Sequence, residues 1–234
     1  MDGCQSSRTS TAEPLNPLAL SLVLTLVGIF LLQFLCGPFD RFAMDYLAMN
    51  SRDFLGKGRI WQPFTAIFVH GSFFRMVVNS LLLLMCGNPL ANAWRKKEFL
   101  AFSVTCGIAG SICFFLFSMM SSRGAIWCGA SGVSFGLLGA YGLVYGKRRI
   151  LLFFCIPMRV KVLVSACFIL LFLLLVFGTG RKADQVVCLG GGICGVVLLK
   201  LIWLWQNRSP SQAATRESET SRIGGLEVMD DDEA

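Results

Sequence analysis

Long apolar runs, separated by short clusters of charged residues, constrain this sequence more than any other feature. Hydrophobic residues make up 55% of the 234 positions and charged residues only 15%, whereas a soluble domain carries about 25% charge. A helix that crosses the hydrocarbon layer of a membrane needs about 20 apolar residues, and most of the runs reach that length. The sequence therefore predicts an all-α, polytopic integral membrane protein.

Six segments are predicted to span the membrane. Five have an ordinary length, at about residues 18–37, 69–90, 99–120, 162–178 and 185–205. The other, at about 131–145, is short and rich in glycine, which suits the centre of a bundle because small residues let neighbouring backbones approach closely. We expect a membrane domain over residues 17–205, with an N-terminal tail at 1–16 and a polar, acidic and disordered C-terminal tail at 206–234.

The loop at 38–60 has an apolar pattern of its own. Phe42, Tyr46 and Met49 are spaced i, i+4 and i+7, with charged residues between them. This spacing would place the three side chains on one face of a helix. We therefore expect part of the loop to lie in the membrane interface as an amphipathic helix.

Basic residues are divided unevenly between the loops. Eight lie in the loops between the second and third and between the fourth and fifth predicted helices: Arg95, Lys96, Lys97, Lys147, Arg148, Arg149, Arg159 and Lys161. The opposite short loops hold three, although the long first loop adds four. Because lysine and arginine concentrate on the cytoplasmic side, both termini are predicted to be cytoplasmic, in the cell (inner) membrane. The same bias explains the net charge of +7 without a nucleic-acid partner.

The ten cysteines do not point to a cofactor. Most of them fall within or beside apolar runs, where cysteine is a small packing residue. None of them forms the paired spacing that is typical of a metal site. We expect no metal, no other cofactor and no disulfide framework.

Polar residues fall at a similar depth on three of the predicted helices. Ser131 opens the short helix, and Cys188 lies near the outer start of the sixth helix. Arg75 and Asn79 lie in the outer half of the second helix. Burying such groups in hydrocarbon is costly, so their convergence usually marks a functional site.

Glycines would allow these helices to meet. Gly191 and Gly195 follow Cys188 at i+3 and i+7 and so share its face of the sixth helix. Packed against the glycine face of the short helix, which includes Gly132 and Gly136, they would bring the thiol close to the serine.

Three short motifs occur in order along the chain. They are Trp61, Gln62, Thr65, Phe68, His70, Arg75 and Asn79; then Gly129-Ala130-Ser131-Gly132 with Phe135; and then Cys188, Gly191 and Gly195. In these residues and their spacing the chain resembles the rhomboid family of intramembrane serine proteases, over about residues 17–205. The resemblance implies a bundle of six transmembrane helices.

The resemblance also implies roles for the retained residues. Ser131 stands at the place of the family's nucleophile. Asn79 and Gly129 stand where the family stabilises the oxyanion, and His70 matches a supporting histidine ahead of them.

Three family positions are altered in this chain. Arg75 replaces a second histidine of the second helix, and Cys188 replaces the histidine that takes the proton from the serine. Ala91 stands at the place of a glutamate that usually follows the second helix. A serine hydroxyl is a weak nucleophile until an adjacent base activates it, and a thiol in apolar surroundings stays mostly neutral. The leading interpretation is a catalytically inactive pseudoprotease that binds the transmembrane helices of client proteins within the lipid bilayer. The alternative is an active intramembrane serine endopeptidase with Ser131 as its nucleophile.

Simpler interpretations stay open for single residues. Ser131 could be a packing residue and helix N-cap, and Arg75 could extend to the interface. A small transporter is a third class of function, but the two halves of the sequence show no inverted repeat.

Overall fold

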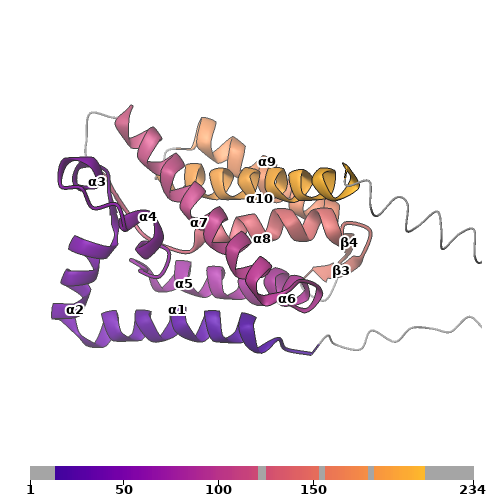
Figure 1. Cartoon of the computed structure of the whole chain (residues 1–234), viewed down its shortest axis with the longest axis horizontal. Coiled ribbons are helices and arrows are strands. Elements are labelled where there is room, and N and C mark those ends of the chain that lie inside the picture. The colour runs from indigo at the N-terminus through magenta and orange to yellow at the C-terminus, as the bar shows by residue number, and fades with distance from the viewer. Residues whose placement is uncertain (1–13, 121–124, 153–155, 179–181, 209–234) are drawn as a thin grey trace, which may run out of the picture. The chain divides into compact units, whose positions relative to one another are not determined.

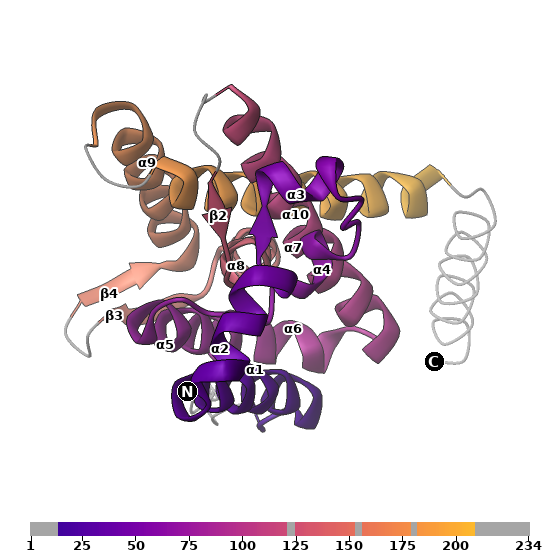
Figure 2. The same cartoon turned by 90° about the vertical axis from the view of Figure 1, so that its left-hand side faces the viewer.

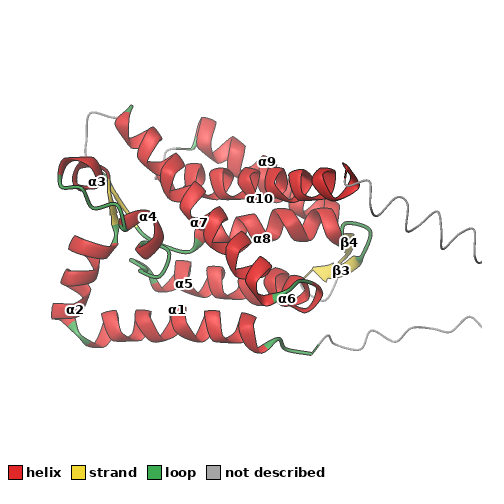
Figure 3. Cartoon of the chain, viewed as in Figure 1, coloured by secondary structure: helices red, strands yellow, loops and turns green. Residues whose placement is uncertain are grey.

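The computed structural model describes residues 14–120, 125–152, 156–178 and 182–208. Helices dominate, with two small two-stranded sheets (Figure 3). In chain order the elements are α1 (Pro17–Leu35), α2 (Gly37–Phe42), η1 (Ala43–Leu47), β1 (Met49–Asn50), α3 (Ser51–Gly56), α4 (Gln62–Thr65), α5 (Phe73–Leu82), η2 (Leu83–Gly87), α6 (Asn88–Ala93), α7 (Lys96–Met119), β2 (Ile126–Trp127), α8 (Ser131–Val144), β3 (Arg149–Leu152), β4 (Ile156–Arg159), α9 (Val160–Phe177) and α10 (Lys182–Arg208). The predicted tails lie largely outside the described residues. Residues up to Val196 form one compact unit, and all packing described below is within it.

Five helical segments among the described residues are long and apolar enough to cross a membrane. They are α1, the run Phe73–Ala93 that comprises α5, η2 and α6, then α7, α9 and α10. α8 is a further apolar helix, but its 14 residues span only about 21 Å, against about 30 Å of hydrocarbon. The chain is an all-α, multi-pass membrane protein whose short helix falls on the predicted glycine-rich segment.

α8 lies at the centre of the compact unit (Figure 2). It contacts α5, η2, α7 and α9, and 11 of its residues are buried. Glycines make this fit possible. A Cβ atom on Gly132 would lie 3.0 Å from the carbonyl oxygen of Cys106 in α7, and one on Gly195 of α10 would lie 2.6 Å from the carbonyl oxygen of Gly136.

α9 is packed far more lightly than its neighbours. Only 11% of its most apolar stretch is buried, against 50% for α7. Val160 and Val164 are its buried residues, whereas Ile169 and Phe172 are exposed. Lipid tails are as apolar as leucine, so such a helix can face the bilayer.

The second span begins later than the sequence predicted. We expected it to begin near residue 69, but α5 begins at Phe73, after the N-cap residue Ser72. The backbone N–H of His70 donates to Oε1 of Gln33 in α1 at 3.2 Å, instead of to a carbonyl of its own helix. His70 therefore lies in the turn between α4 and α5 and not on the span.

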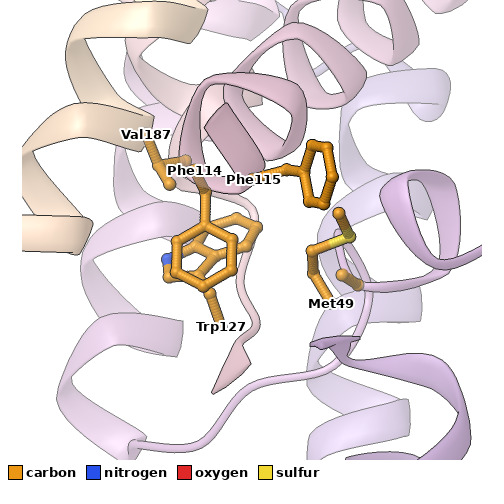
Figure 4. Packing of buried hydrophobic residues seen from close by; sticks show 6 residues of the cluster. Met49, Phe114, Phe115, Trp127 and Val187 are labelled. Atoms are coloured by element: carbon orange, nitrogen blue, oxygen red, sulfur yellow. The ribbon is translucent and has the colours of Figure 1, made fainter. Parts of the chain in front are cut away.

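The predicted amphipathic helix over 42–49 is correct only as far as Leu47. Phe42 and Tyr46 are about half exposed, and their rings stack with centroids 5.3 Å apart. Met49 lies instead in β1, which pairs antiparallel with β2, and its side chain is fully buried. Figure 4 shows it in a cluster with Phe114, Phe115, Trp127 and Val187. Strand pairing thus ends the helix and places Met49 in the core.

A hairpin that the sequence did not predict joins α8 to α9. Its strands β3 and β4 pair antiparallel, with Arg149 opposite Arg159. The hairpin lies at the end of α8 remote from Ser131 (Figure 1). Tyr145, at the end of α8, donates from its hydroxyl to the carbonyl oxygen of Pro89 in α6 at 3.3 Å.

Candidate functional site

Ser131 is the first residue of α8, and a tight turn delivers it there. Gly129 has a φ of +138°, a conformation that favours glycine, and its N–H donates to the carbonyl oxygen of Ala66 at 2.9 Å. The N-cap residue is Ala130, and no side chain caps the helix. The buried Ser131 hydroxyl is therefore not used as a cap.

Gly129 also leaves room for the polar groups around it. A Cβ atom there would lie 3.8 Å from both Oγ of Ser131 and Nδ2 of Asn79, and 3.9 Å from Cδ2 of His70. The turn thus gathers side chains from α8, from α5 and from the segment before α5.

His70 holds this turn in place. Nδ1 lies 3.3 Å from the carbonyl oxygen of Phe68, so the tautomer that satisfies the ring carries its proton on Nδ1. Nε2 then accepts from Nδ2 of Asn79 and from the backbone N–H of Ala130, each at 3.3 Å. The single acceptor nitrogen of the ring is shared between two donors.

The His70 ring is also held neutral. Burial lowers its pKa from 6.5 to about 4; the charge of Arg75 adds to this effect and the hydrogen bond to Phe68 opposes it. An imidazole that is neutral across the physiological range supports the turn as a hydrogen-bonding group.

Asn79 connects α5 to α8. Its side chain is 3% exposed and donates to His70. Its backbone carbonyl accepts the hydroxyl of Ser134 at 3.3 Å. The backbone carbonyl therefore holds the second span to the short helix, and the side chain holds it to the turn before α5.

Cys188 approaches Ser131 from α10. The residue is buried, and its thiol lies beside the hydroxyl of Ser131. A Cβ atom on Gly191 would lie 2.5 Å from the Cα of Gly132, so only glycine allows α10 to come this near. We call His70, Asn79, Ser131 and Cys188 the polar cluster.

Arg75 has a partner that sequence reasoning missed. Its Nη1 lies 3.0 Å from Oδ1 of Asp184 in α10, and the two side chains are 27% and 32% exposed. Arg75 precedes Asn79 by four residues and Asp184 precedes Cys188 by four, so the ion pair lies one helical turn beyond the cluster. The sequence did contain a signal for this ion pair, because two opposite charges each stand four residues before a predicted site residue.

Gln33 was also missed. It is 4% exposed within α1 and accepts the N–H of His70, while its amide donates to Oδ1 of Asp40 at 3.1 Å. A glutamine inside an apolar run is itself a signal, because a polar group in hydrocarbon needs a partner.

Comparison with known proteins identifies the family of this chain. The family model described as "Rhomboid domain" matches residues 57–205, which is more than half of the chain. The chain belongs to the rhomboid family. The matched range contains the complete polar cluster and the Arg75–Asp184 pair.

Curated relatives are similar over parts of their length. Rhomboid protease GluP of Bacillus subtilis (strain 168) is 29% identical over 121 residues, 52% of this chain and 23% of the relative. RHOMBOID-like protein 1 of Arabidopsis thaliana is 34% identical over 106 residues, 45% of this chain and 26% of the relative. Rhomboid-like protease 3 of Toxoplasma gondii is 27% identical over 143 residues, 60% of this chain and 51% of the relative. The chain thus spans about half or less of the relatives it matches.

Proposed function

We propose that this rhomboid is catalytically inactive and binds the transmembrane helices of client membrane proteins. One observation carries the proposal. The hydroxyl of Ser131 has the Cys188 thiol as its neighbour, while the one histidine of the chain already uses its acceptor nitrogen for Asn79 and Ala130.

The proton of the Ser131 hydroxyl has no suitable acceptor among the residues that the structure describes. Ser131 can attack a peptide bond only if a base takes that proton. To take it, His70 would have to release two N–H donors and become a buried cation, although burial lowers its pKa to about 4. Cys188 stands where the family places its general base, and a thiol is a base only as the thiolate. Loss of the histidine in a soluble serine protease costs about 10⁶ in turnover.

Arg75 supports the same conclusion. In the proposed alignment it replaces a histidine that helps to hold the oxyanion. Its guanidinium binds the carboxylate of Asp184. A donor that is engaged by a carboxylate is not preorganised for negative charge that develops at the scissile carbonyl.

α9 offers a place for a client helix. Its exposed apolar side chains face what would be lipid, and a client span could replace that lipid without uncovering any buried surface. Helices in membranes associate through van der Waals contact and interhelical hydrogen bonds, and the polar cluster lies in the same unit.

A cleavage assay tests the inactive state. The full chain, Ser131→Ala, Cys188→His and the double variant Cys188→His/Arg75→His are reconstituted in vesicles with a model rhomboid substrate. We expect no cleavage by the native chain or by Ser131→Ala, and cleavage by a histidine-restored form that is lost when Ser131→Ala is added. Cleavage by the native chain that Ser131→Ala abolishes would contradict the proposal.

Photocrosslinking tests client binding. A photoreactive amino acid at Ile169 of α9 should crosslink to a substrate transmembrane helix. The same probe at Leu24 of α1 is the matched control, because both side chains are 60% exposed. Equal crosslinking at the two positions would mean random collision in the bilayer and would refute a site at α9.

An active intramembrane serine endopeptidase is the second candidate. It is favoured by the retained Ser131 hydroxyl and by the buried Asn79 amide close to Gly129. In that case the native chain cleaves the substrate, and Asn79→Ala slows cleavage by about 10²–10³, as for other oxyanion donors.

The proposed topology has both termini in the cytoplasm of the cell (inner) membrane. The basic residues at the α6–α7 and α8–α9 connections support it. Terminal epitope tags should be protected from protease in intact cells and cleaved after lysis. Cleavage of either tag in intact cells would overturn the topology.

A further inference from the structure

A cavity lies at the opposite end of α8 from Ser131. It has a volume of about 1340 Å³ and is lined by the end of α8, the ends of the β3–β4 hairpin, the first turns of α9 and Val196 of α10. The polar cluster contributes nothing to its described lining. Its chemistry is therefore separate from that of the proposed function and does not depend on it.

Positive charge dominates one wall of this cavity. Its described lining includes five basic residues and no Asp or Glu: Lys147, Arg148, Arg149, Arg159 and Lys161. All five are exposed. We call this cavity the basic pocket.

The backbone brings these charges together. Arg149 and Arg159 are opposite each other across the hairpin. Lys161 donates its N–H to the carbonyl oxygen of Gly146 at 3.2 Å, and the guanidinium of Arg148 lies 4.2 Å from the centre of the Tyr145 ring. Like charges directly opposite in a strand pair are destabilising. A bound anion would remove that penalty.

Most of the remaining lining is apolar. It includes Leu143, Val144, Val162, Val164, Phe168, Ile169 and Val196. A cavity that combines a basic cluster with apolar side chains matches an amphiphile, with an anionic head and hydrocarbon tails. A soluble anion would gain nothing from contact with the apolar side chains.

The pocket also lies where such a molecule is found. Four of the five basic residues lie in the connection between two apolar helices, α8 and α9, and Lys161 lies in the first turn of α9, so together they mark the boundary between hydrocarbon and water. Basic pockets between transmembrane helices bind the head groups of anionic lipids.

We infer that the basic pocket is a binding site for an anionic phospholipid. The phosphate lies between Arg149 and Arg159 with Lys147, Arg148 and Lys161 around it, and the acyl chains lie along Leu143, Val144 and Val162, away from the α9 surface proposed for client helices.

Native mass spectrometry of the full chain tests this inference. The protein is taken from nanodiscs of phosphatidylcholine mixed with phosphatidylglycerol, and the retained lipids are counted. The native chain should retain phosphatidylglycerol preferentially. Arg149→Gln/Arg159→Gln should weaken that retention by about 30-fold, from about 1 kcal/mol for each basic residue at a membrane surface.

Lys96→Gln/Lys97→Gln is the matched control. It removes the same charge from the start of α7, at the same end of the unit as the hairpin, from residues outside the described lining. We expect it to retain phosphatidylglycerol as the native chain does. An equal loss in the two double variants would reduce the effect to general surface charge and overturn the site.

Two further measurements keep the result unambiguous. In phosphatidylcholine alone, Arg149→Gln/Arg159→Gln should unfold at the same temperature as the native chain or higher, because a repulsive pair is removed. A lower unfolding temperature there would make the arginines structural and refute the inference. Inorganic phosphate, compared with chloride at equal ionic strength, should not displace the lipid; displacement would show a site for a soluble anion.

Discussion

The two ends of α8 place polar groups in opposite ways. At its start, the residues of the polar cluster are buried, and their side chains interact with one another or with nearby backbone. At its end, the five basic side chains of the basic pocket are exposed and all carry positive charge. Inside a bilayer no water satisfies a buried polar group, so the residues of the polar cluster find their partners within the protein. The five basic side chains can instead bind water, ions or lipid head groups at the membrane interface. The difference separates a region determined by packing from a region determined by charge.

The largest expected effect comes from the close packing of α10 against the start of α8. Gly191→Leu would place a side chain against the backbone of Gly132, and relief requires moving α10 as a whole. We expect a loss of about 3 kcal/mol or more of stability, measured by thermal unfolding in detergent. Gly28→Leu is the control, because a Cβ atom at Gly28 has nothing within 4 Å. If both variants behave alike, close helix packing does not define this end.

The next effect is a pH dependence that belongs to His70. Its folded pKa is lowered to about 4 from 6.5, so between these values the unfolded chain binds the proton and the folded chain does not. Stability is then complete above the unfolded pKa and falls as the pH falls towards the folded one. We expect a loss of about 2 kcal/mol between about pH 7 and about pH 5.

His70→Gln provides the control for this prediction. Whatever its effect at neutral pH, it should remove most of that slope in the same unfolding experiment. A slope unchanged by His70→Gln would mean that other groups produce it and that the His70 ring is not held neutral.

A smaller effect is expected from the ion pair beyond the cluster. Arg75 and Asp184 are each about a third exposed or less, so solvent screens their attraction and the pair contributes about 1 kcal/mol or less. A double-mutant cycle of Arg75→Gln and Asp184→Asn measures this coupling by thermal unfolding. A coupling near zero would mean that the pair does not hold α5 to α10.

The smallest effect has the opposite sign. Arg149→Gln in detergent without anionic lipid should raise stability by a few tenths of a kcal/mol, because it removes one of two like charges across the hairpin. Lys96→Gln should leave stability unchanged. A loss of stability in Arg149→Gln would remove the contrast between the two ends, since packing would then determine both.

Much of the architecture could be predicted from the sequence. The length of each apolar run alone indicated the spans. Whether a segment can cross the hydrocarbon depends on its own residues, because polar groups without partners are costly there. The glycine-rich run at 131–145 predicted a short helix, which α8 is. The predicted helix boundaries differed from the structure where a tertiary contact replaced a helical hydrogen bond. This occurs at His70, whose N–H donates to Gln33, and at Met49, which pairs with Trp127.

The partners of the polar groups were decided only by the tertiary structure. The sequence identified Ser131, Cys188, Asn79, His70 and Arg75 as candidates, and the rhomboid motifs related them to one another. It did not indicate that the His70 acceptor nitrogen is shared between two donors, that Arg75 binds Asp184, or that Arg149 faces Arg159. Hydrogen bonds and ion pairs depend on distances of about 3 Å between different helices and strands. Such distances are set when the helices pack, and hydropathy, which is a property of each segment by itself, does not contain them.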